Sequence, residues 1–173
     1  MATGSLMGAL NPLKQKTTIP DILLLPTYQN QLRNIGRHLD TQEYRSISIL
    51  DVEGGILVRA FTSRKHESEL LEFPDGAFGE MVRDSIGGRG RRKKVHRNTP
   101  LIPTGYEDLL RAIGFELDQR LAKAVTLHET HRSIFVAGLA ASDSASGSFS
   151  PFDLTLTERD IQSVLDAAFR RRG

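Results

Sequence analysis

The sequence contains no cysteine and no tryptophan among its 173 residues, and aromatic residues make up only 6% of it. The absence of cysteine excludes disulfides, thiolate metal sites and cysteine nucleophiles. It is also consistent with a reducing compartment, so we expect a cytoplasmic protein. Hydrophobic residues still account for 39% of the chain. The composition therefore predicts a folded protein with an aliphatic core.

Long apolar runs are also lacking. The longest one near the N-terminus, Ile22 to Leu25, is far too short to span a bilayer. The first twenty residues lack the basic start and continuous apolar stretch of a signal peptide. We therefore expect a flexible N-terminal segment over residues 1–22 and no membrane partner.

Patterns that carry catalysis or bind metals are missing as well. The stretch HETH, residues 128–131, places its two histidines three apart in a predicted strand and turn. A zinc-protease motif needs them four apart on a helix. The glycine-rich stretch GGRGRRKK, residues 87–94, lacks the Gly-Lys-Ser/Thr ending of a phosphate loop. We predict no catalytic residues, no metal site and no cofactor.

The charge is small in total but unevenly distributed. The formal net charge is +2, from 23 basic and 21 acidic residues. Residues 89–97 contain six cations and no acid, and three arginines stand close to the last residue. Without these nine cations, 14 basic residues remain against 21 acidic ones, a net charge of −7. The pattern indicates two basic segments attached to an acidic body.

An internal repeat organises the chain. Residues 27–40 and 105–118 align at an offset of 78, with seven of fourteen positions identical. In each copy the apolar identities lie on one face of a predicted amphipathic helix. The identical positions, in first-copy numbering, are Tyr28, Leu32, Arg33, Ile35, Gly36, Leu39 and Asp40.

Two features of the repeated helix need a reason. Glycine inside a helix costs about 1 kcal/mol relative to alanine, so Gly36 and its counterpart Gly114 predict close approach of another backbone. Arg33 and Asp40 stand seven apart, as do Arg111 and Asp118 in the second copy. Either they form a structural ion pair or a contact at the strand ends, or they mark a duplicated ligand site.

The similarity continues beyond the helix. Residues 43–61 and 121–139 alternate apolar with small or polar residues, which predicts half-buried strands. Glu53-Gly54-Gly55 predicts the turn of a hairpin. Further on, the copies realign at an offset of 83 over a final amphipathic helix. We assign the five extra residues to a flexible serine-rich loop, ASDSASGSFSPF, residues 141–152.

These patterns predict an α+β protein. Each copy contains a helix, a β-hairpin, room for a short third strand, and a final helix. We expect the two units to pack with pseudo-twofold symmetry, with an antiparallel sheet and helices on one face. The predicted divisions are residues 1–22, repeat 1 at 23–86, a basic linker at 87–100, and repeat 2 at 101–173 with a basic C-terminus.

The first functional hypothesis is non-catalytic binding of nucleic acid, DNA or RNA. Clustered cations bind phosphate backbones by releasing counterions, without reading the bases. The residues predicted to make these contacts are Arg89, Arg91, Arg92, Lys93, Lys94, Arg97, Arg170, Arg171 and Arg172.

The alternative is a protein-binding adaptor or chaperone-like module, acting as a homodimer or with a protein partner. Alternation along the strands places some apolar residues on the sheet face that the helices leave open. An apolar patch on such a face usually meets a partner. The predicted interface residues are Leu57, Phe61, Phe135 and Leu139.

Overall fold

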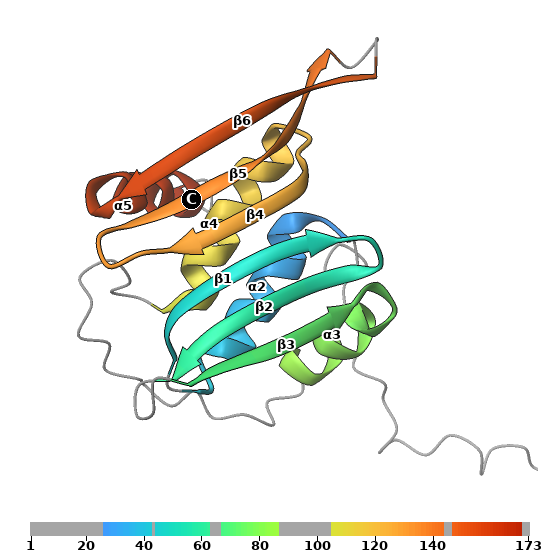
Figure 1. Ribbon diagram of the computed structural model, residues 1–173, viewed down its shortest axis with the longest axis vertical. Coiled ribbons are helices and arrows are strands. Elements are labelled where there is room, and N and C mark those ends of the chain that lie inside the picture. The colour runs from blue at the N-terminus through green and yellow to red at the C-terminus, as the bar shows by residue number, and fades with distance from the viewer. Residues whose placement is uncertain (1–25, 43, 63–66, 87–104, 144–146, 171–173) are drawn as a thin grey trace, which may run out of the picture.

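The computed structural model describes residues 26–42, 44–62, 67–86, 105–143 and 147–170. Within them lie six strands, four α-helices and one short 3₁₀ helix (Figure 1). In chain order the elements are α2 (Tyr28–Leu39), β1 (Tyr44–Val52), β2 (Gly55–Thr62), β3 (Ser68–Pro74), η3 (Asp75–Ala77), α3 (Phe78–Ile86), α4 (Tyr106–Gln119), β4 (Lys123–Glu129), β5 (Ser133–Asp143), β6 (Ser148–Thr157) and α5 (Glu158–Arg170).

The strands form one antiparallel sheet in the order β3-β2-β1-β4-β5-β6. Figure 1 shows all four α-helices on the same side of this sheet, behind the strands. The α+β class with an antiparallel sheet is therefore confirmed. Strands β3 and β6 form the two edges. No described helix is both long and apolar enough to cross a membrane.

The third strand of each half is longer than expected. β3 has seven residues and β6 has ten. The serine-rich stretch predicted as a flexible loop is mostly hairpin, because Ala141 pairs with Phe149 and Asp143 with Ser148. Ser148 to Pro151 are all exposed. No side chain of this stretch is buried in the core, so the ladder hydrogen bonds are the main contacts that hold it.

The core lies between the helices and the sheet. Three side chains of α2 and three of α4 are at most 2% exposed: Leu32, Ile35, Leu39, Leu110, Ile113 and Leu117. They belong to one buried cluster with four residues of β1 and β2, Ile47, Ile49, Ile56 and Val58. Burying each such side chain contributes about 1.5–3 kcal/mol. This aliphatic layer is the main stabilising feature of the fold.

Helices α2 and α4 touch backbone to backbone. A Cβ atom added to Gly36 would lie 2.5 Å from the carbonyl oxygen of Tyr106. One added to Gly114 would lie 2.6 Å from the carbonyl oxygen of Tyr28. Both distances are shorter than any real Cβ contact. The predicted close approach is therefore confirmed, and the neighbour at each glycine is the other helix.

The first turn of α4 is capped by a residue of α2. The residue before α4, Gly105, has no side chain and a φ of 102°. Asp40, at the end of α2, accepts hydrogen bonds from the backbone N–H groups of Tyr106 at 2.8 Å and Glu107 at 3.0 Å. The carboxylate thus satisfies donors that lack partners inside α4 and suits the positive end of the helix dipole.

The same contact is made in the opposite direction. Asp118, near the end of α4, accepts from the backbone N–H groups of Tyr28 and Gln29, both at 3.0 Å. Thr27 supplies a further cap to Asn30 at 3.3 Å. Asp40 and Asp118 are therefore helix caps and not the ion-pair partners that their spacing suggested.

The two halves of the sheet join along a short ladder between β1 and β4. Three residue pairs make it: Ser48 with His128, Ile49 with Leu127, and Leu50 with Thr126. Past one end of the ladder, the Glu129 carboxylate accepts the Ile47 N–H at 3.1 Å and the Tyr106 hydroxyl at 2.6 Å.

Beyond the other end of the ladder, a tyrosine and a carboxylate also meet. The Tyr28 hydroxyl donates to Asp51. Burial and the neighbouring Asp51 carboxylate raise the pKa of Tyr28 well above its usual value. At each end of the β1–β4 ladder, a tyrosine from the first residue of a helix therefore hydrogen-bonds a carboxylate of the sheet.

Substituting Gly36 or Gly114 by alanine tests the helix contact. We expect each change to lower the free energy of unfolding by about 3 kcal/mol or more, because the methyl group meets rigid backbone. Gly79→Ala in α3 is the matched control, since a Cβ there meets nothing within 4 Å. It should raise stability by about 0.5–1 kcal/mol. Chemical denaturation measures all three; a loss below about 1 kcal/mol at both α2–α4 glycines would contradict the contact.

Candidate interaction surface

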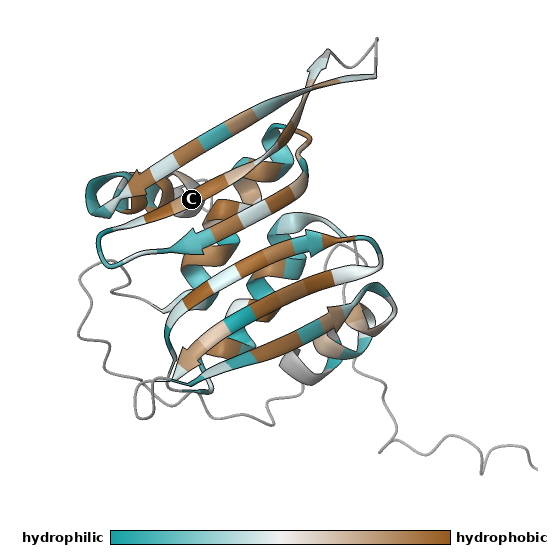
Figure 2. Ribbon diagram, in the orientation of Figure 1, coloured by the Kyte–Doolittle hydropathy of each residue, from teal (hydrophilic) through white to brown (hydrophobic). Residues whose placement is uncertain are grey.

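The side of the sheet away from the helices, here called the uncovered face, is formed by every second residue of each strand. Figure 2, seen from this side, shows hydrophobic and hydrophilic residues alternating along the strands. Strand pairing arranges the side chains in rows. One row is Leu70, Arg59, Ser48, His128, Phe135 and Thr155; the next is Glu72, Leu57, Leu50, Thr126, Ala137 and Asp153.

Four large apolar side chains are exposed on the uncovered face. Leu50 is 43% exposed, Leu70 55%, Phe135 40% and Phe149 40%. They come from four different strands, and polar residues separate them: Arg59, Ser48 and His128 stand between Leu70 and Phe135 in one row. The remaining large exposed hydrophobic residue of the described chain, Leu121, lies in the turn between α4 and β4. Four of these five residues thus lie on one face, which makes it the candidate interaction surface.

Polar groups interrupt the apolar surface at defined places. Ser48 Oγ and His128 Nδ1 are 2.6 Å apart across β1 and β4. The Lys123 ammonium lies 3.5 Å from the ring centroid of Phe149, a cation–π contact. Glu72 and Asp153 stand on the two edge strands. The face therefore offers apolar contact with acidic groups at both margins.

The four residues predicted as an interface all lie on this face. Phe135 is exposed, whereas Leu57, Phe61 and Leu139 are half-buried. The prediction missed three more exposed residues. Alternation with the buried Ile49 could have identified Leu50. The other two, Leu70 and Phe149, belong to third strands that the sequence pattern did not define.

The predicted nucleic-acid contacts fall largely outside the described residues. This holds for Arg89, Arg91, Arg92, Lys93, Lys94 and Arg97 in the linker, and for Arg171 and Arg172. Arg170 is the last residue of α5. The described ranges contain 11 lysine and arginine residues against 19 aspartate and glutamate residues, a net charge of −8. The acidic excess inferred from the sequence thus lies within the described residues.

The stretch HETH spreads its side chains apart. His128 is exposed on the uncovered face, whereas Glu129 is 3% exposed and contacts Tyr106 on the helix side. His131 lies between β4 and β5. Among the described residues, no group of three or more potential ligands could hold a metal ion. These residues do not converge on a common ligand.

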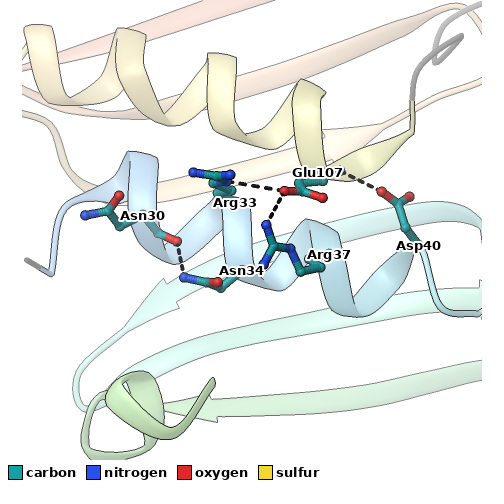
Figure 3. Close-up of polar contacts among 6 residues, drawn as sticks. All are labelled: Asn30, Arg33, Asn34, Arg37, Asp40 and Glu107. Carbon is teal, nitrogen blue, oxygen red and sulfur yellow. Dashed lines mark hydrogen bonds and ion pairs between the residues drawn. The ribbon is translucent and has the colours of Figure 1, made fainter. Parts of the chain in front are cut away.

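A buried carboxylate between α2 and α4 meets two arginines (Figure 3). Glu107 is 4% exposed. Its Oε1 lies 2.7 Å from Arg37 Nη2 and 3.3 Å from Arg33 Nε. Two cations around one buried carboxylate offset the cost of removing its charge from water. The backbone N–H of Glu107 also donates to Asp40. Glu107 therefore joins the two helices through its side chain and its backbone, and we interpret this cluster as structural.

Comparisons with known proteins supply no relative. No protein-family model matches the chain, and neither the curated proteins nor the solved structures contain a match. A functional argument for this chain therefore rests on its own surfaces.

Substitutions of residues on the two faces of β1 and β5 test the assignment of the uncovered face. Leu50→Thr and Phe135→Thr should change the free energy of unfolding by no more than about 1 kcal/mol, because both side chains are exposed. Their chain neighbours Ile49 and Val136 are buried, so Ile49→Thr and Val136→Thr should each cost about 2–4 kcal/mol. Equal losses of unfolding free energy at the exposed and the buried positions, measured by denaturant unfolding, would show that the uncovered face is not exposed to solvent.

Proposed function

We propose that this protein is a non-catalytic protein-binding module whose uncovered face receives an apolar segment of another polypeptide. The observation that supports this proposal is the exposure of Leu50, Leu70, Phe135 and Phe149 on the one sheet face that no described helix covers. Exposed apolar side chains of this size lower the free energy of the complex when a partner removes them from water.

The chemistry of the surface indicates the kind of segment. Apolar side chains would contact the middle of the face, and basic residues at either end of the segment would meet Glu72 and Asp153 on the edge strands. The net charge of −8 over the described residues favours such a basic segment.

The expected affinity follows from the number of apolar side chains. The four side chains are already about half buried, so covering the rest contributes about 3–6 kcal/mol in total. Association costs about 4 kcal/mol or more in lost translational and rotational freedom. These four side chains alone therefore correspond to binding in the millimolar range or weaker.

We further propose that the fold is a duplication, with units at residues 23–86 and 101–173 related by a pseudo-twofold axis. Supporting it, residues 78 apart make equivalent contacts: Gly36 packs on α4 as Gly114 packs on α2. Asp40 caps α4 as Asp118 caps α2. The central β1–β4 pair, Ile49 with Leu127, is also 78 apart, so the axis passes through it.

Nucleic-acid binding is the second candidate, and charge segregation favours it. The residues outside the described ranges contain 12 lysines and arginines against two acidic residues, a net charge of +10 beside a body of −8. Such segments bind phosphate backbones through counterion release.

Salt dependence tests the second candidate. Affinity for a duplex oligonucleotide should fall steeply with added salt, and replacing the six cations of residues 89–97 by glutamine should abolish it. An affinity that changes neither with added salt nor with these substitutions would rule this candidate out.

Suppression of aggregation tests the protein-binding proposal. Reducing insulin releases its B chain, an apolar polypeptide that aggregates and scatters light. The protein contains no cysteine, so the reductant leaves it covalently unchanged. The intact protein should suppress the scattering in proportion to its concentration. The double variant Leu50→Thr/Phe135→Thr should need about tenfold more protein or more for the same effect, since it loses two buried contacts.

Leu121→Asn is the matched control, because it removes a leucine that is 62% exposed and lies in a turn. It should suppress scattering as well as the unmodified protein does. Light scattering coupled to size exclusion gives the oligomeric state of each variant, which separates partner capture from self-association through the same face. A strict monomer that fails to suppress scattering, or that works equally well in all variants, contradicts the proposal.

A further inference from the structure

A pocket of about 210 Å³ lies between α4, α5 and the β5–β6 hairpin. Its walls are aliphatic: Ile113 and Leu117 come from α4, Val136, Leu154 and Leu156 from the hairpin, and Val164 from α5. The pocket is on the helix side of the sheet, so it is separate from the uncovered face.

The first half holds a smaller space that shares three of the equivalent positions. Ile35, Phe73 and Met81, the counterparts of Ile113, Leu156 and Val164, help to line about 10 Å³ between α2, α3 and the β2–β3 hairpin. Phe73 and Leu156 hold equivalent positions, since Phe73 pairs with Ile56 and Leu156 with Ile134. The phenylalanine ring fills space there that the leucine leaves empty.

A second pair of equivalent positions also differs in side-chain size. Met81 of α3 lines the small space, and Val164 of α5 lines the large one. At both positions the second half carries the smaller side chain. Both differences leave more room beside α5 than beside α3.

The volume limits what the pocket can hold. An apolar cavity of about 150 Å³ takes a benzene molecule. A volume of 210 Å³ therefore suits an aliphatic chain of about six to eight carbons. An aliphatic lining favours a saturated chain.

The mouth of the pocket carries one ion pair. Arg120 Nη1 lies 3.0 Å from Glu116 Oε2, and the two side chains are 36% and 35% exposed. The guanidinium carbon of Arg120 is 6.0 Å from the ring centroid of Phe152. Arg120 is the one cation among the residues that line the pocket.

Arg120 has the geometry to hold a carboxylate as well. Both of its hydrogen bonds to Glu116, to the side chain and to the backbone oxygen, use Nη1. A guanidinium presents five N–H donors in a planar fork. It can therefore bind a ligand carboxylate without releasing Glu116.

We propose that this pocket binds a medium-chain carboxylate, with the aliphatic tail between α4, α5 and the β5–β6 hairpin and the carboxylate on Arg120. The tail removes the aliphatic walls from water, and the charged head stays at the exposed mouth. The acid of about eight carbons is the best match in length.

Titration of the full-length protein with sodium octanoate tests the site, followed by methyl NMR. Saturable shifts are expected at Leu154, Leu156 and Val164. Under the same conditions 1-octanol should bind about tenfold more weakly, because it lacks the charge that pairs with Arg120. Octylamine should bind no better than the alcohol.

The filling variant carries at positions 156 and 164 the residue types that the first half has at the equivalent positions. Leu156→Phe with Val164→Met should abolish octanoate binding and leave the thermal midpoint of the unliganded protein equal or higher. The converse exchange, Phe73→Leu with Met81→Val, is the control and should leave octanoate binding at the second-half pocket intact. Arg120→Gln should remove the preference for octanoate over octanol.

Three results overturn the proposal. The first is an absence of saturable octanoate binding to the full-length protein. The second is octanoate affinity in the filled Leu156→Phe/Val164→Met variant that equals that of the unmodified protein. The third is an octanoate preference that survives Arg120→Gln.

Discussion

The backbone contact between α2 and α4 is the constraint on which the rest of the structure depends. Gly36 and Gly114 let the helices approach until a methyl group no longer fits. At that distance the end of each helix lies against the start of the other, so Asp40 and Asp118 can cap across the interface. The pair then acts as one rigid layer. Against it β1 and β4 meet in a short ladder, and six strands become one sheet.

This arrangement accounts for the two surfaces to which we assign binding. The described helices all lie on one side (Figure 1), so apolar residues on the other side stay exposed across both halves of the sheet. On the helix side, the packing of each half depends on side-chain size. Phe73 lines a small space in the first half, whereas Leu156 lines a larger pocket in the second. The uncovered face and the pocket thus have different origins, one in topology and the other in packing.

Local patterns predicted much of this fold, and long-range geometry accounts for most of what they missed. Helical spacing and alternation located the helices, the first hairpin and the buried Ile47 and Ile49. The role of Asp40 was not predictable, because its partner is the start of a helix 66 residues away. Leu70 and Phe149 were missed because serine, proline and charged residues obscure alternation in the edge strands. The basic segments lie outside the described residues, so the sequence remains the sole guide to them.

The most direct test of the central claim is methyl NMR of the protein during titration with reduced insulin B chain. We predict shifts at Leu50, Leu57 and Leu70, which lie on the uncovered face. The methyl groups of Leu32 and Leu110, buried in the helix layer at 2% and 0% exposure, should stay unchanged. Shifts confined to the helix layer, or to the pocket beneath α5, would contradict the assignment of the uncovered face as the binding surface.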